Sequence, residues 1–259
     1  MTRTRKVLLG LGTLSALAVV AFFAVPVVFG FNSVGPPPLQ IGDRAEESLA
    51  LVLGRSDGAQ PAEDLSTVGD EVEVGAITTR IETADGAWIV TGDSVAGYRV
   101  FKDFVGAREF EAVGRTSEVT GDLVIEDDTV IGAEFDVFVG TITSDDPRRD
   151  AQFRGPILMT DIYRTATFEL SSPIQLGDAA RTGEPIVVEA QGQLTLKGVT
   201  NDVDLELTAR LVGDEVQVSG SIDVEFDDFD IEPPFTPTIV VRDSGIIEFS
   251  LFFEAVSSV

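Results

Sequence analysis

A pattern with a period of two residues is the feature that most constrains the fold. It begins near Glu71 and recurs almost to the end of the chain. In residues 131–139 (IGAEFDVFV), apolar residues alternate with small or charged ones. Successive side chains of a strand point to opposite faces, so the pattern predicts strands with one apolar and one polar face. No helical period is sustained over this region, and the sequence therefore predicts an all-β fold.

Eight more segments have strand character, and short clusters rich in Gly, Asp and Ser separate many of them. The segments are 88–90, 96–101, 119–125, 166–171, 186–196, 203–211, 216–226 and 246–253. The predicted turns are Asp85-Gly86, Thr120-Gly121, Glu126-Asp127-Asp128, Gly198, Gly213-Asp214 and Ser244-Gly245. Closely spaced strands without crossover helices favour antiparallel pairing. Composition alone leaves a closed barrel and a β-sandwich open, because either fold would bury one face of each strand.

The N-terminal part of the chain is apolar, and residues 7–31 carry no charge. At about 1.5 Å per residue, a helix of this length reaches ~37 Å, which exceeds the ~30 Å hydrocarbon core of a bilayer. A cleaved secretory signal is the alternative, but its apolar region is shorter, at ~7–15 residues, and residues 21–24 (AFFA) are a poor cleavage site. Arg3, Arg5 and Lys6 precede the segment, and basic flanks stay on the cytoplasmic side. We predict a single-pass protein of the cell membrane, with residues 1–6 in the cytoplasm and the C-terminal domain outside.

Residues 32–85 are predicted to form a tether between the membrane helix and the β domain. Three consecutive prolines at 36–38 favour an extended polyproline segment. Residues 44–53 (RAEESLALVL) favour a short helix that Gly54 and Pro61 terminate, although a partly ordered spacer explains them equally well. An initial strand is predicted at 71–74, and the β domain itself covers 86–256.

Composition excludes several kinds of chemistry. The chain has neither Cys nor His, which removes disulfides, thiol chemistry and catalysis or zinc binding through imidazole. Beyond residue 31 there are 15 basic and 44 acidic residues, and this net charge of −29 opposes binding to nucleic acid. Acidic pairs that could hydrolyse glycosides occur by chance in so acidic a chain, and Lys102 and Lys197 lie in no nucleophile motif. We predict no enzymatic activity and no cofactor.

The densest acidic run, at 223–232, could be read as a calcium site. It lacks the Gly turn and the spaced oxygen ligands of a calcium-binding loop. Alternation places Asp223 and Glu225 on one face, and the adjacent Asp227 and Asp228 break the register, which predicts a bulge. We interpret the run as a solvated strand face and predict no metal.

Six short stretches, in their order and spacing, resemble one known family. They are 86–90 (GAWIV), 94–100 (SVAGYRV), 113–121 (VGRTSEVTG), 144–150 (SDDPRRD), 166–168 (ATF) and 194–200 (LTLKGVT). Over roughly 86–255 the chain resembles the YceI-like family of lipid- and polyisoprenoid-binding proteins, in the membrane-anchored form of actinobacteria.

The resemblance implies a lipocalin-like antiparallel β-barrel, whose apolar interior holds a long isoprenoid chain, and it implies no enzymatic activity. Some relatives are dimeric, so it also allows a homodimer. Two departures affect contacts with the head group of a ligand. Relatives usually carry a His near the position of residues 101–103, and a Tyr-Pro pair where this chain has Tyr163 and Arg164.

Alternation within three predicted strands identifies candidate residues for contact with a ligand in a barrel lumen. They are Ala96, Tyr98, Val100, Ala133, Phe135, Val137, Leu205 and Leu207. We expect structural roles for Trp88 as a core anchor, for Arg149 and Asp150 as a pair that holds a loop, and for Gly198 in a hairpin turn. Tyr98 suits either a core position with a satisfied hydroxyl or a polar contact inside the lumen.

These features predict a membrane-anchored extracytoplasmic protein that binds an apolar lipid, such as a polyprenyl chain or a quinone tail. The alternative is a non-enzymatic structural or interaction module, with a solid core, held on a stalk. A hollow interior would favour the first interpretation, because an empty apolar cavity is costly unless a ligand fills it.

Overall fold

The structure, a computed structural model, describes residues 35–54, 84–104, 109–177, 180, 182–234 and 239–256. The predicted cytoplasmic tail, the predicted membrane helix at 7–31 and the predicted strand at 71–74 lie outside these residues. Within them, no helix combines the length and the apolar character needed to cross a membrane.

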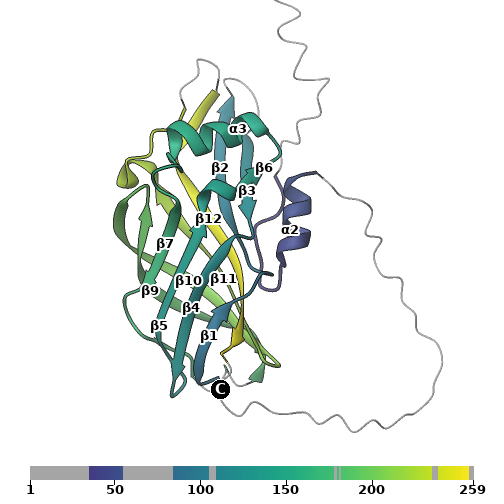
Figure 1. Cartoon of the computed structure of the whole chain (residues 1–259), viewed down its shortest axis with the longest axis vertical. Helices are drawn as coiled ribbons and strands as arrows, with labels where there is room; N and C mark the ends of the chain where they lie inside the picture. Colours follow the sequence, from purple (N-terminus) through teal and green to yellow (C-terminus); the bar gives the residue numbers. More distant parts are fainter. Residues whose placement is uncertain are drawn as a thin grey trace, which may run out of the picture. The chain divides into compact units, whose positions relative to one another are not determined.

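Eight strands in the described segments form a closed ring in which every neighbour is antiparallel (Figure 1). They are β1 (Gly86–Val90), β4 (Val119–Glu126), β5 (Thr129–Phe138), β7 (Thr165–Leu170), β9 (Ile186–Leu196), β10 (Val199–Val212), β11 (Glu215–Glu225) and β12 (Ile239–Ala255). The pairing of β1 with β12, which sets Trp88 opposite Ala255, closes the ring. The antiparallel barrel is therefore confirmed and the sandwich alternative is excluded.

Two further strands continue the barrel wall beyond short breaks. β2 (Val95–Phe104) follows β1 along the same edge of β12, and β3 (Glu109–Thr116) pairs with β2 and precedes β4. At the first break, the Ser94 hydroxyl accepts a hydrogen bond from the Phe252 amide at 2.9 Å. This contact replaces a missing main-chain partner, so the edge of β12 stays satisfied. Two short strands, β6 (Thr143–Ser144) and β8 (Ile174–Gln175), add to β3 and β5.

Hairpin turns occupy several of the predicted positions. Asp127 and Asp128 both have positive φ between β4 and β5, as do Lys197 and Gly198 between β9 and β10. Positive φ at both central residues is the geometry that tight hairpins need. At Gly198 a Cβ would also lie 2.6 Å from the Tyr163 ring, so only glycine suits this turn.

Three predicted irregularities were wrong in detail. Gly121 lies inside β4, where a Cβ would come within 2.2 Å of the Glu134 carbonyl oxygen, so this glycine permits close strand approach. Gly245 lies inside β12, where the register against β2 shifts after Val241. The expected bulge at Asp227 and Asp228 is instead a 3₁₀ turn, η4 (Phe226–Phe229), because both of its phenylalanines are buried in the core.

The connection between β5 and β7 covers one end of the barrel (Figure 1). It contains η1 (Val139–Thr141), β6, α3 (Pro147–Gln152) and the π-helical turn η2 (Phe153–Ile157). α3 begins where the Asp146 carboxylate accepts a hydrogen bond from the Arg148 amide at 2.9 Å, with Pro147 in the first turn. These are ordinary helix-start features, yet the short helix was not predicted. We call residues 139–164 the cap.

The described part of the predicted tether packs against the outside of the barrel. It contains the helix α2 (Ala45–Val52), which contacts β3 (Figure 1). Leu39 and Ala45 bury their side chains with Val95 of the wall, and the Arg44 guanidinium lies 4.4 Å above the Phe252 ring. Residues 35–54, which we call the strap, are therefore part of the folded domain.

A buried charge network joins the strap to the wall. Glu248 of β12 accepts hydrogen bonds from Arg99 of β2 and Arg115 of β3, at 3.2 and 2.8 Å, and all three residues are at most 3% exposed. The same guanidinium groups donate to the main-chain carbonyls of Pro36 and Pro37 at 2.8 and 2.6 Å. The strap carbonyls thus accept hydrogen bonds from arginine N–H groups that Glu248 alone could not satisfy.

We predict that Glu248→Ala lowers the free energy of unfolding by about 3–5 kcal/mol, because it leaves two buried arginines without their shared carboxylate. Glu254→Ala is the matched control, since Glu254 is exposed on the same strand, and a change within about 0.5 kcal/mol is expected there. Urea denaturation of both variants measures the difference. Equal losses in the two variants would contradict a special role for Glu248.

Candidate functional site

The barrel encloses two apolar cavities that meet inside it. The cap compartment, of about 170 Å³, lies against the cap, and the central compartment, of about 110 Å³, lies deeper in the barrel. Ala96, Val137, Ala166 and Ile247 line both cavities. Two of these shared positions are alanines, whose small side chains leave room between the compartments. The interior thus holds two adjoining cavities within a core that other apolar side chains fill.

The structure places all eight predicted lumen residues on this inner surface. Tyr98 and Val100 line the cap compartment. Four others, Ala133, Phe135, Leu205 and Leu207, line the central compartment, while Ala96 and Val137 line both. The alternation of each strand brings them to one side, because every second residue of a barrel strand points inward. That these residues bind a ligand stays a prediction.

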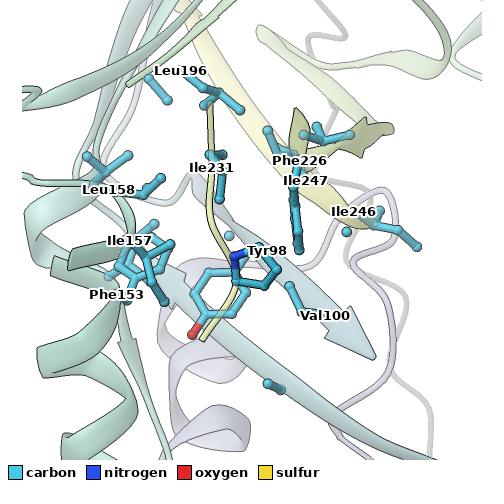
Figure 2. Close-up of a pocket in the computed structure, with 18 of the residues that line it drawn as sticks. Tyr98, Val100, Phe153, Ile157, Leu158, Leu196, Phe226, Ile231, Ile246 and Ile247 are labelled. Carbon is cyan, nitrogen blue, oxygen red and sulfur yellow. The ribbon is translucent and has the colours of Figure 1, made fainter. Parts of the chain in front are cut away.

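Aromatic side chains shape both compartments. In the cap compartment, the Tyr98 ring stacks on Phe153 of η2 with ring centroids 4.8 Å apart (Figure 2). Gly114 of β3 makes room for Tyr98, since a Cβ there would lie 2.5 Å from its ring. In the central compartment, Phe135 lies 6.2 Å from the Phe168 ring. The cap is therefore tied to the lumen through ring packing.

The cap compartment has one polar region. Its polar lining side chains are those of Tyr98, Lys102, Arg149 and Gln152. Lys102 belongs to the inward face of β2 because it continues the series of Ala96, Tyr98 and Val100. The central compartment, by contrast, is lined entirely by apolar side chains.

Arg149 and Asp150 do not form the expected pair. The Arg149 guanidinium forms an ion pair with Asp145 one helical turn earlier. Asp150 is buried and accepts hydrogen bonds from the Ser144 amide at 3.0 Å and from the Ser144 hydroxyl at 2.6 Å. Adjacent residues of a helix diverge around its axis, so the two side chains serve different partners. Asp150 fixes the cap, whereas Arg149 lines the cavity.

Burial shifts the pKa values of two side chains in this polar region, Tyr98 and Lys102. Burial raises the pKa of Tyr98 from 10.0 to about 12, although the positive charge of Arg149 partly opposes this shift. Burial also lowers the pKa of Lys102, and the like charge of Arg149 lowers it further. Asp146 and Asp145 act on Lys102 in the opposite direction. Tyr98 is therefore a neutral hydroxyl at any ordinary pH.

The remaining structural candidates lie away from the cavities. Trp88 is buried in the core, and its indole N–H donates to the Ala84 carbonyl at 2.9 Å. Gly198 forms the β9–β10 turn, next to Tyr163. Neither residue lines the two compartments.

Sequence reasoning missed the lining residues that lie outside regular strands. They include Phe153, Ile157 and Leu158 of the cap, and Ile231, Pro233 and Pro234 after η4 (Figure 2 labels four of them). The alternation of apolar and polar residues that identifies strands cannot identify these residues, because the backbone there is helical or irregular. The apolar residues at 153, 157 and 158 were the available signal, because a solvated loop has little use for them.

Fold and site together define a class of protein, a closed up-and-down β-barrel with an apolar lumen. A family model described as the YceI-like domain matches residues 91–253, which is more than half of the chain. The chain therefore belongs to the YceI-like family, as its sequence stretches indicated. No protein with a curated function matches it in sequence.

Two solved bacterial structures are similar to this chain. A polyisoprenoid-binding domain from Saccharophagus degradans, implicated in plant cell wall breakdown, has a TM-score of 0.52 and 17% sequence identity, over 65% of this chain and 98% of that one. BcnA from Burkholderia cenocepacia has a TM-score of 0.48 and 16% identity, over 61% of this chain and 95% of its own. At such identities the first likeness establishes the fold alone.

We predict that the Tyr98 phenolate forms only near pH 12. The pKa of Tyr98 is raised above that of an unfolded tyrosine, so its contribution to stability is complete below about pH 10 and is lost as the pH rises toward 12. Near-ultraviolet absorbance of the intact protein and of Tyr98→Phe isolates this titration. A phenolate transition near pH 10 that disappears in Tyr98→Phe would contradict the buried geometry.

Proposed function

We propose that the barrel binds a lipid by enclosing a single apolar chain in the lumen. The observation that carries this proposal is the pair of joined apolar compartments, since a solid interaction module would fill the same space with side chains. Apolar cavities of about 150 Å³ bind small hydrocarbons in other proteins. A slim chain matches two such cavities in succession better than a bulky ring system does.

Burial of the chain provides enough free energy to hold it. Each buried CH₂ group contributes about 0.8 kcal/mol, so three isoprene units could contribute roughly 10 kcal/mol before ordering costs. Micromolar affinity corresponds to about 8 kcal/mol, so the burial contribution exceeds that value before ordering costs are subtracted. The lumen needs no catalytic group for this function, and we propose a binding protein instead of an enzyme.

We propose a polyisoprenoid as the bound chain, either a polyprenyl lipid or the tail of a quinone. Membership of the YceI-like family supports this choice, as does the likeness to a domain that is named for polyisoprenoid binding. The branched methyl groups of an isoprenoid also suit the wide points of a lumen in which alanines alternate with phenylalanines, as at Ala133 and Phe135.

We further propose that the protein is anchored in the cell membrane with its barrel on the extracytoplasmic side. The support is in the sequence, namely the uncharged residues 7–31 and the basic residues before them. An anchor would keep the lumen next to a source of apolar lipid.

We predict that Ala166→Phe reduces the retention of a polyprenyl lipid at least tenfold, because Ala166 lies where the two compartments meet. Val187→Phe is the matched control, since Val187 is 61% exposed and the added ring there stays outside the barrel. Native mass spectrometry of the purified proteins measures the lipid retained, and thermal unfolding checks the fold. If folded wild-type protein neither carries a lipid nor binds added polyprenol, the proposed function is wrong.

The proposed anchor gives a separate prediction. The full-length chain should sediment with membranes and resist extraction by high salt, since its attachment is hydrophobic, while a variant without residues 7–31 should be released. Fractionation followed by immunoblotting measures both. Recovery of a shortened wild-type chain, cleaved after Ala24 and free of membranes, would show a signal peptide instead.

A further inference from the structure

We propose that the cap compartment selects lipids with an anionic head group, a phosphate or a carboxylate, through Lys102 and Arg149. This inference rests on the proposed function, because it concerns the head of the same lipid whose chain fills the lumen. It names a class of head group that is preferred over neutral heads such as quinones and free alcohols.

Arg149 uses only part of its hydrogen-bonding capacity. Its terminal nitrogen pairs with Asp145 at the exposed side of α3. Its Nε atom is buried and has no hydrogen-bond partner among the described residues. A buried donor without a partner is costly, and Arg149 lines the cap compartment. A ligand oxygen would satisfy this donor after a shift of the Arg149 side chain, because Nε is enclosed in the structure.

Lys102 of β2 is a second cation that lines the same cavity. Lys102 is half-buried on the inward face of β2 and forms no ion pair within the described segments. Burial lowers the pKa of Lys102 and the charge of Arg149 lowers it further, so the two cations repel each other. One anion bound between them would remove the repulsion and add charge-assisted hydrogen bonds.

Acidic groups near these cations are already engaged. Asp150 is held by Ser144, and Asp146 caps the start of α3. Asp145 pairs with Arg149 but is largely exposed, so it opposes an anion less than a buried carboxylate would. These carboxylates keep their charge, but none of the three lines the compartment, whereas Lys102 and Arg149 do.

The distribution of charge over the whole chain points in the same direction. Beyond residue 31 acids outnumber bases by 29, whereas within the cap four arginines balance four aspartates, at 145, 146, 150 and 161. A mostly negative surface repels anions generally, so a compartment whose charged lining residues are Lys102 and Arg149 is a specific place for them. The Tyr98 hydroxyl lines the same cavity and adds a neutral donor.

The test compares two ligands with the same chain and different heads. Farnesyl phosphate and farnesol are titrated into the delipidated full-length protein in one detergent, by isothermal titration calorimetry. We expect farnesyl phosphate to bind about tenfold or more tightly, which is the usual scale of a charge-assisted contact. Inorganic phosphate alone should bind far more weakly than farnesyl phosphate, because it lacks the chain.

Two variants locate the preference. Arg149→Gln and Lys102→Met should each reduce the ratio of the affinity for farnesyl phosphate to the affinity for farnesol several-fold. Arg148→Gln is the matched control, because Arg148 is exposed on the same helix and lines neither compartment. It should keep the wild-type ratio. Lys102→Met breaks no ion pair in the described structure, so it tests the proposal even if Arg149→Gln loosens the cap.

The outcomes separate this inference from the proposed function. Equal affinity for farnesol and farnesyl phosphate overturns the inference and leaves chain binding intact. An equal effect of Arg148→Gln and Arg149→Gln also overturns it, since general surface charge would then explain the preference. Tight binding of inorganic phosphate would show a site for the free anion instead of a lipid head. Failure of both farnesyl ligands to bind overturns the inference and the proposed function together.

Discussion

Closure of the main-chain hydrogen-bond ring between β1 and β12 is the constraint on which the rest of the molecule depends. A closed ring has no free edge, so the pleat alone decides which side chains are enclosed. Residues such as Ala96, Ala133 and Ala166 are then locked into the interior, where their small size leaves space. The hollow lumen therefore follows from small residues at inward positions of a ring that cannot collapse.

The same pleat gives two adjacent residues opposite environments. On β2, Tyr98 and Val100 face the lumen, while Arg99 between them joins the buried charges on the outer wall. Burying two arginines and a glutamate is tolerated there because Glu248 accepts hydrogen bonds from both guanidinium groups, and strap carbonyls accept from both as well. The strap thus lets a barrel with an apolar inside also carry a polar buried layer on one outer face.

Much of the barrel and its inner surface could be predicted from sequence, because both depend on local alternation. The strand predicted at 186–196 has those bounds in β9, and the lumen residues all lie on the inner wall. Other features depend on contacts between distant segments and leave no periodic trace. The ion pair of Arg149 with Asp145, the buried turn at Phe226 and the docking of the strap are of this kind. Lys102 was within reach of the pattern, since it extends the series Ala96, Tyr98 and Val100, but the predicted series of lumen residues ended at Val100.

The strap also determines how the domain meets mechanical load. Tension on the chain ahead of Gly35 reaches the carbonyl contacts of Pro36 and Pro37 with Arg99 and Arg115 before it reaches the seam of the barrel. Both arginines also bind Glu248 in the middle of β12, and β12 is paired with β11 along one edge and with β2 along the other. A pull from that side would therefore act on β2, β3 and β12, which carry the three buried charges, before it acts on β1.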